Sequence, residues 1–154
     1  MSFGTNSEEL PFRMLRLVLC LLLMISTAIA DSYGDRVLGR FWLPEKDGQV
    51  EIYRQGDKYF GRIVSYDVAG QLDEKNPDPD LRKRPIVGID LLADFRYDEE
   101  GARWFDGTIY DAKSGKTYKC RLWFEDDDSG ALWARGYIGI SLLGRTELFQ
   151  RVSE

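Results

Sequence analysis

The fold is decided by residues 49–66, Gln49-Val50-Glu51-Ile52-Tyr53-Arg54-Gln55-Gly56-Asp57-Lys58-Tyr59-Phe60-Gly61-Arg62-Ile63-Val64-Ser65-Tyr66. In the first half, apolar and polar side chains alternate, with Val50 and Ile52 on one face, as in a strand that buries one side. Gly56-Asp57 is a two-residue sequence typical of a hairpin turn. The segment therefore predicts an antiparallel hairpin in which residues 58–66 return beside residues 49–55.

Six further segments of strand length flank this hairpin, and residues typical of turns separate most of them. They are residues 37–43, 89–97, 102–110, 116–124, 131–138 and 145–152. No stretch after residue 30 has the period of a helix of ordinary length. About eight consecutive strands joined mainly by short turns predict an all-β, antiparallel up-and-down barrel, which leaves no strand edge unpaired.

The alternation assigns an inner face to some of these strands and leaves others open. In residues 116–124, the side chains of Tyr118, Cys120, Leu122 and Phe124 share one face, which we expect to be the interior. In residues 102–110 and in residues 131–138, both faces carry apolar bulk, so either face could point inward.

The first 30 residues predict a secretory signal peptide, with Arg13 and Arg16 before a continuous apolar run over residues 17–25. Small residues at Ala28 and Ala30 complete the pattern of a cleavage site. The apolar run is shorter than the ~20 residues that a membrane-spanning helix needs, which disfavours the alternative of an uncleaved anchor.

We therefore expect cleavage after Ala30, a periplasmic or secreted location, and one domain over residues 31–154. We expect no stable membrane insertion after cleavage. The formal net charge of −5 is the same with and without residues 1–30, because this segment carries two basic and two acidic residues. A negative chain is not expected to bind nucleic acid or an anionic membrane.

The composition also argues against an enzyme, because the chain contains no histidine to serve as a general base or zinc ligand. Only Cys120 remains after cleavage, so no intramolecular disulfide forms. We expect a buried thiol in a monomer, with a bridge between two chains as the alternative. The acidic runs 98–100 and 125–128 lie in expected turns. They could hold calcium, but solvated turns are the simpler interpretation, and we predict no catalytic residue, metal or cofactor.

Residues 67–88 form the only long connection, and three of the five prolines of the chain lie in residues 76–88. Asn76 and Asp78 are candidates to cap a turn or a short helix. Arg82 and Arg84 could bind a carboxylate or phosphate group, or could pair with acids of the protein surface. We predict these four residues as contacts of a functional loop, with a structural brace as the alternative.

Aromatic residues occur in nearly every expected strand, and they could fill the barrel or line a cavity. The predicted ligand-binding residues are Trp42, Tyr53, Trp104, Tyr110, Tyr118, Arg135 and Tyr137. We expect a small apolar or amphipathic ligand. The alternative is a periplasmic interaction module, either an envelope assembly factor or an inhibitor, that uses the 67–88 loop.

Several stretches resemble the DUF2147 family of small exported bacterial proteins. They are Gly39-Arg40-Phe41-Trp42, residues 50–64, Asn76-Pro77-Asp78, Leu81-Arg82-Lys83-Arg84-Pro85, Gly107-Thr108-Ile109-Tyr110-Asp111, Ser114-Gly115-Lys116-Thr117-Tyr118, Arg135-Gly136-Tyr137 and Gly144-Arg145-Thr146. The resemblance implies a lipocalin-like barrel without a settled activity. Lipocalins carry Gly-x-Trp in the first strand, whereas the spacing here is Gly39-x-x-Trp42. Many family members have cysteines where this chain has Gln55 and Phe60, so the resemblance implies no thiol role there.

Overall fold

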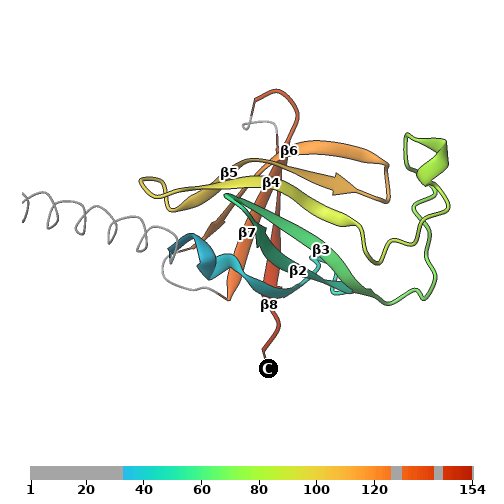
Figure 1. Ribbon diagram of the computed structural model, residues 1–154, viewed down its shortest axis with the longest axis horizontal. Coiled ribbons are helices and arrows are strands. Elements are labelled where there is room, and N and C mark those ends of the chain that lie inside the picture. The colour runs from blue at the N-terminus through green and yellow to red at the C-terminus, as the bar shows by residue number, and fades with distance from the viewer. Residues whose placement is uncertain (1–32, 126–129, 141–143, 154) are drawn as a thin grey trace, which may run out of the picture. The chain divides into compact units, whose positions relative to one another are not determined.

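The computed structural model describes residues 33–125, 130–140 and 144–153 (Figure 1). Eight antiparallel strands close into a barrel in which each strand pairs with its neighbours along the chain and β8 pairs with β1. The strands are β1 (Gly39–Trp42), β2 (Gly48–Gln55), β3 (Lys58–Tyr66), β4 (Asp90–Asp98), β5 (Arg103–Asp111), β6 (Lys116–Phe124), β7 (Ala131–Tyr137) and β8 (Arg145–Arg151). The predicted fold class is confirmed.

The barrel belongs to a compact unit that spans Gly34–Glu154. The expected signal segment, residues 1–30, lies outside the described residues, so its cleavage stays a prediction. Within the described part of the chain, no helix is long and apolar enough to cross a membrane.

The hairpin formed by β2 and β3 is the one predicted from residues 49–66. Gln55 pairs with Lys58 across the Gly56-Asp57 turn, where Gly56 adopts a φ of 66° that favours glycine. Several predicted strand bounds differ from the structure by one residue, and the first strand differs by two, because residue 37 does not begin it. Val37 ends a short 3-10 helix, η1 (Asp35–Val37), and its side chain is fully buried.

The barrel interior is packed by side chains from all eight strands. The main cluster contains Phe41, Val50, Ile52, Tyr59, Leu92, Phe95, Trp104, Cys120, Leu122, Phe124, Leu132, Ala134 and Phe149, together with Val37 and Leu43 beside the strands. The predicted inner face of β6 is therefore confirmed at Cys120, Leu122 and Phe124. On β7, Leu132 and Ala134 point inward, which places the intervening residues on the outer wall.

A β-bulge explains why the sequence of β5 gave no clear inner face. Trp104 pairs with Leu122, but Gly107 rather than Asp106 pairs with Cys120, so one extra residue is inserted on β5. Asp106 adopts a positive φ of 58° at this point. The inward positions therefore pass from Trp104 to Gly107, and the period of two is interrupted.

The short helix η1 closes one end of the barrel, at the left of the view in Figure 1. The indole Nε1 of Trp104 donates to the carbonyl oxygen of Gly34 at 3.1 Å, and the Tyr59 hydroxyl donates to Asp35 at 2.9 Å. Arg151 donates to the carbonyl oxygens of Leu38 and Arg36, and burial lowers the pKa of its guanidinium. The long connection between β3 and β4 lies at the opposite end (Figure 1).

Candidate functional site

The long connection is held by a buried carboxylate. Asp73 is fully buried, and its Oδ1 accepts a hydrogen bond from the Tyr110 hydroxyl at 2.5 Å. Its Oδ2 accepts from Asn76 Nδ2 at 2.7 Å and from Arg84 Nε at 3.0 Å, with Arg84 Nη2 2.9 Å away. A buried charge needs both an opposite charge and hydrogen bonds, and Asp73 has both. This network ties the connection to β5.

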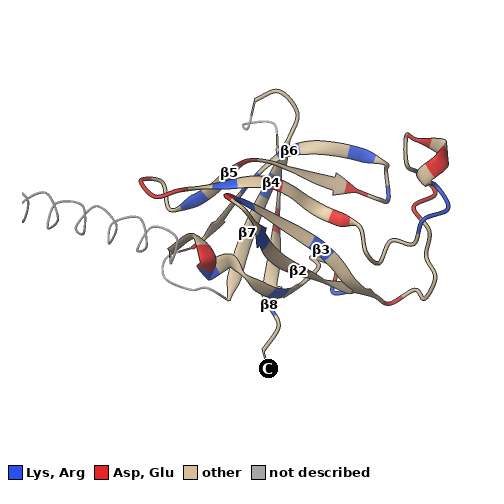
Figure 2. Ribbon diagram, viewed as in Figure 1, with Lys and Arg blue, Asp and Glu red and all other residues tan. Residues whose placement is uncertain are grey.

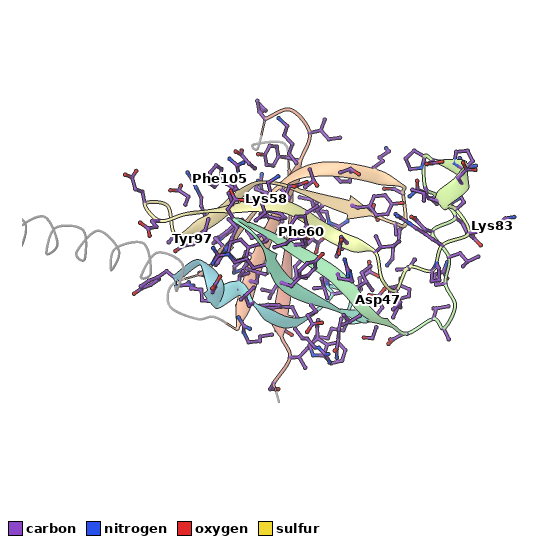
Figure 3. The ribbon with its side chains drawn as sticks, in the orientation of Figure 1. Asp47, Lys58, Phe60, Lys83, Tyr97 and Phe105 are labelled. Carbon is purple, nitrogen blue, oxygen red and sulfur yellow. The ribbon has the colours of Figure 1, made fainter. Side chains whose placement is uncertain are left out.

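The predicted loop residues contribute to the hydrogen bonds around Asp73, which act as a brace for the connection. The Asn76 side-chain oxygen accepts from the Asp78 amide at 2.9 Å, while its backbone oxygen accepts from Arg82 Nε at 2.8 Å. Asp78 in turn accepts from the Asp80 amide and caps the short 3-10 helix η2 (Pro79–Leu81). The capping predictions are therefore confirmed for Asn76 and Asp78. Lys83 is exposed and points outward (Figure 3).

The backbone of the connection between β3 and β4 lies in close contact with the turn between β5 and β6. A Cβ atom added to Gly115 would lie only 1.8 Å from the Lys75 carbonyl oxygen, and Gly115 has a φ of 73°. Both the contact and the conformation require glycine there. Leu72 and Pro85 form an isolated antiparallel bridge that joins the two arms of the connection.

The network changes the acidity of Tyr110. Burial, followed by the hydrogen bond to Asp73 and the charge of that carboxylate, raises the pKa of Tyr110 to about 12. Since the hydroxyl donates to Asp73 and accepts from Asn76 Nδ2 at 3.2 Å, it is a fixed neutral member of the network at physiological pH.

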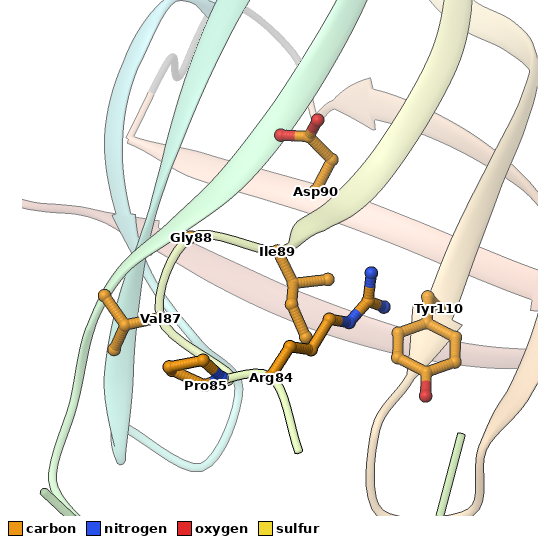
Figure 4. A pocket seen from close by; sticks show the side chains of 7 residues that line it. All are labelled: Arg84, Pro85, Val87, Gly88, Ile89, Asp90 and Tyr110. Carbon is orange, nitrogen blue, oxygen red and sulfur yellow. The ribbon is translucent and has the colours of Figure 1, made fainter. Parts of the chain in front are cut away.

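A pocket of about 420 Å³ opens beside this brace (Figure 4). It is lined by Arg84, Pro85, Val87, Gly88, Ile89, Asp90 and Tyr110. Pro85, Val87 and Ile89 supply an apolar surface, and Ile89 belongs to a second buried cluster with Ile63 and Ile86. Arg84, Asp90 and Tyr110 supply the polar groups. The volume falls within the roughly 300–1,000 Å³ typical of small-molecule sites.

A second polar network borders the pocket at Asp90. Arg62 binds this carboxylate with two nitrogens, Nε at 2.9 Å and Nη2 at 3.1 Å, and the Tyr53 hydroxyl donates to it at 3.1 Å. Phe60 stacks on Tyr53 with ring centroids 5.7 Å apart. Burial and the neighbouring Asp90 raise the pKa of Tyr53. Asp90 is therefore held by groups on the outside of the barrel.

The structure does not gather the seven predicted ligand-binding residues in one place. Trp104 is fully buried in the core, where its ring packs edge-on against Tyr59 and Phe124. Trp42 lines a separate pocket of about 230 Å³ with Leu43, Pro44, Lys46, Leu148 and Gln150.

Tyr118 shares the inward side of β6 with Cys120 and pairs with Ile109. Arg135 and Tyr137 alternate with inward Ala134, so they lie on the outer wall of β7. Tyr53 and Tyr110 approach the same pocket, Tyr110 directly and Tyr53 through Asp90. Their roles as ligand contacts stay a prediction.

Three features of this site could not be predicted from the sequence. Asp73 lies in a stretch without periodicity, so its burial could not be expected. The apolar Val87 and Ile89 follow Pro85 in a segment that looks like a loop. Asp90 begins a strand, and its partner Arg62 is identified only once β3 and β4 are in register.

Reactive groups are few within the described residues. Burial raises the pKa of the Cys120 thiol to about 12, so almost no thiolate is present at neutral pH. In the described ranges, no three Cys, Asp or Glu side chains are grouped so that they could hold a metal ion.

A closed eight-stranded antiparallel barrel with a plugged end and one long connection defines a lipocalin-like protein. The chain belongs to the family described as "Uncharacterized protein conserved in bacteria (DUF2147)", which matches residues 39–151. It is similar to the solved structure described as "Protein HP1028 from the human pathogen Helicobacter pylori belongs to the lipocalin family". The identity is 26%, the TM-score is 0.64, and the match covers 77% of this chain and 84% of that chain. No curated protein matches the sequence.

Proposed function

We propose that this protein is an exported, non-enzymatic barrel that binds a small amphipathic ligand in the pocket beside Tyr110. The observation that carries the proposal is the combination of an apolar surface with a fixed cation in one opening of suitable size. The likeness to a lipocalin supports the class of function, and the pattern of residues 1–30 supports export.

The barrel interior is a less suitable site. Side chains from all eight strands meet in one buried cluster, and the largest of them, Trp104, is fully buried. Protein interiors packed in this way leave little room for a guest molecule. Both pockets described above open on the outside of the barrel. The ligand therefore binds at the root of the long connection rather than inside the barrel.

The chemistry of the pocket restricts the ligand. Val87, which is 47% exposed, and Pro85 offer an apolar surface to a hydrocarbon or ring. Arg84 turns Nε and Nη2 toward Asp73, but a guanidinium has five N–H donors, so donors remain for an acceptor on the ligand. The Tyr110 hydroxyl is already used twice. The ligand thus combines an apolar body with one carboxylate, sulfonate or carbonyl group.

A titration with anilinonaphthalene sulfonate tests this site, because this probe has an aromatic body and one anionic group. We expect saturable binding, with NMR shift changes concentrated in residues 84–90 and at Tyr110. Val87→Asp should weaken binding by about tenfold, because it replaces an apolar contact by a negative charge that repels the anionic probe. Val68→Asp is the matched control, because Val68 is 56% exposed in the same connection but outside the pocket. Shift changes centred on Tyr118 and Ile109 would instead place the ligand inside the barrel.

A second function is supported by the shape of the connection itself. The brace around Asp73 fixes residues 67–88, yet Val68, Leu81 and Val87 stay exposed. A rigid loop with exposed apolar side chains can serve as a contact surface for a protein of the cell envelope. A photo-reactive residue placed at Leu81 should then crosslink one partner in the producing cell. Loss of that crosslink with Val87→Ser, but not with Ile138→Ser, would identify the loop as the contact.

A further inference from the structure

The outer wall formed by β6, β7 and β8 is basic, although the whole chain is acidic. The buried residues Cys120, Leu122 and Phe124 fix which side chains of β6 face out, and the pairing fixes those of β7 and β8. The outward residues are Thr117, Lys119, Arg121, Trp123, Ala131, Trp133, Arg135, Tyr137, Thr146, Leu148 and Gln150. Within the strand bounds this wall contains three basic residues and no acid, and the exposed Glu125 follows β6 directly.

Two of these cations lie directly opposite each other. Arg121 and Arg135 are paired across β6 and β7, an arrangement that destabilises a sheet when the charges are alike. Arg135 Nη1 donates to the Thr146 hydroxyl at 2.8 Å, and the Arg121 guanidinium lies 5.6 Å from the centroid of the Trp123 ring. Lys119 is paired with Tyr137 in the next row. The three basic residues of the wall therefore lie close together on β6 and β7.

The most exposed apolar side chains described in the structure extend from the same strand. Ile138 and Ile140 follow Tyr137 at the end of β7 and are 68% and 62% exposed. In Figure 2 the described part of the connection between β7 and β8, at the top of the view, is uncharged, and β6 nearby carries basic segments. Protruding aliphatic residues, a tyrosine at their base and basic residues behind them are the features of a peripheral membrane contact.

We propose that this surface docks the barrel on a bilayer with anionic headgroups. Ile138 and Ile140 enter the edge of the acyl region, Tyr137 lies at the level of the headgroups, and Lys119, Arg121 and Arg135 face the lipid phosphates. The net charge of −5 does not prevent this contact, because at physiological salt a charge is screened beyond about 8 Å. The basic residues near the bilayer therefore outweigh acids elsewhere on the barrel.

Hydrogen exchange of the chain that begins at Asp31, with vesicles of phosphatidylethanolamine and phosphatidylglycerol, tests this contact locally, because the barrel lies in the compact unit Gly34–Glu154. We expect new protection of residues 131–140 and none of residues 67–88. The double variant Ile138→Ser, Ile140→Ser should lower vesicle affinity by more than about tenfold. Arg121→Gln and Arg135→Gln should each lower it about fivefold, the equivalent of one charge at an anionic surface. All variants begin at Asp31, so the apolar run of residues 17–25 contributes nothing to the measured affinity.

The controls are Val68→Ser and Lys83→Gln, which change an exposed apolar and an exposed basic residue of the long connection. They should leave binding unchanged. Arg121→Gln should weaken binding without lowering Tm, because it removes the like-charge pair. Absence of protection at residues 131–140 would overturn the proposal, as would equal binding to pure phosphatidylcholine vesicles. Retention on an immobilised anionic polysaccharide without any vesicle binding would overturn the assignment to lipid.

Discussion

Replacement of Tyr110 by phenylalanine removes one hydroxyl group and leaves the ring in place. That hydroxyl donates to the buried Asp73 carboxylate at 2.5 Å and accepts from Asn76 Nδ2 at 3.2 Å. If the Asp73 network holds the long connection, the loss of this one oxygen should reduce the free energy of unfolding of the whole barrel.

The magnitude follows from what remains after the substitution. A hydrogen bond to a charged group contributes about 1.5–3 kcal/mol. Asp73 keeps its contacts with Arg84 and Asn76, so the carboxylate is not left without partners, and the cost stays in the lower part of this range. We expect a loss of about 2 kcal/mol and a decrease in Tm of about 8 °C for a domain of this size.

Urea unfolding followed by tryptophan fluorescence measures this loss. Tyr118→Phe is the matched control, because the Tyr118 hydroxyl makes no hydrogen bond to any described residue. Equal unfolding midpoints for wild type and Tyr110→Phe would refute the reasoning. An equally large loss in the control would refute it too, because the effect would then not depend on Asp73.

The pH dependence provides an independent check on the same residue. The pKa of Tyr110 is raised from 10.0 to about 12 in the folded chain. A group whose pKa rises on folding stabilises the fold fully below its unfolded value and loses that contribution as the pH climbs through the folded value. Wild-type stability should therefore fall between pH 10 and pH 12, and Tyr110→Phe should reduce that fall. Some decline should remain, because the pKa values of Tyr53 and Tyr66 are also raised.

Three further predictions concern the core and the N-terminus. Gly107→Ala should destabilise the barrel by about 2–3 kcal/mol, because its Cβ would lie 2.4 Å from the Phe95 ring, and Phe95→Leu should recover part of the loss in urea unfolding. Cys120 should not react with a thiol reagent at neutral pH until the chain is denatured, since burial raises its pKa to about 12; prompt reaction of the native protein would contradict this. N-terminal sequencing of the protein from its producing cell should begin at Asp31, and a sequence that begins at Met1 would exclude cleavage.

The barrel could be predicted from the sequence because its signals are local. A period of two over residues 49–55 and a Gly56-Asp57 turn are sufficient for one hairpin, and the same signals recur along the chain. Consecutive antiparallel strands without a long crossover then favour closure. Val37 shows the limit of this reasoning, because an apolar residue at the start of a strand-like segment is equally suited to a buried 3-10 turn.

The inner face of β5 could not be predicted because a bulge interrupts the period. Asp106 adopts a positive φ, and Asp94 on β4 does the same at 64°. Aspartate tolerates this conformation, but it is also common in ordinary positions of loops and strands. Nothing in the sequence around Asp106 distinguishes an aspartate with a positive φ from an ordinary strand residue. The change of inward position from Trp104 to Gly107 is therefore visible only in the pairing with β6.

The same limit applies to the pocket and to the basic wall. Arg121 and Arg135 are 14 positions apart, and they become neighbours only because Leu122 pairs with Ala134 and sets the register of β6 and β7. The net charge of −5 indicates little about such a wall, because it sums over the whole surface, whereas a contact responds to charges within about one Debye length. In an antiparallel barrel, alternation can therefore collect basic residues on one side of a chain whose composition is acidic, so net charge alone does not decide whether this fold meets an anionic membrane.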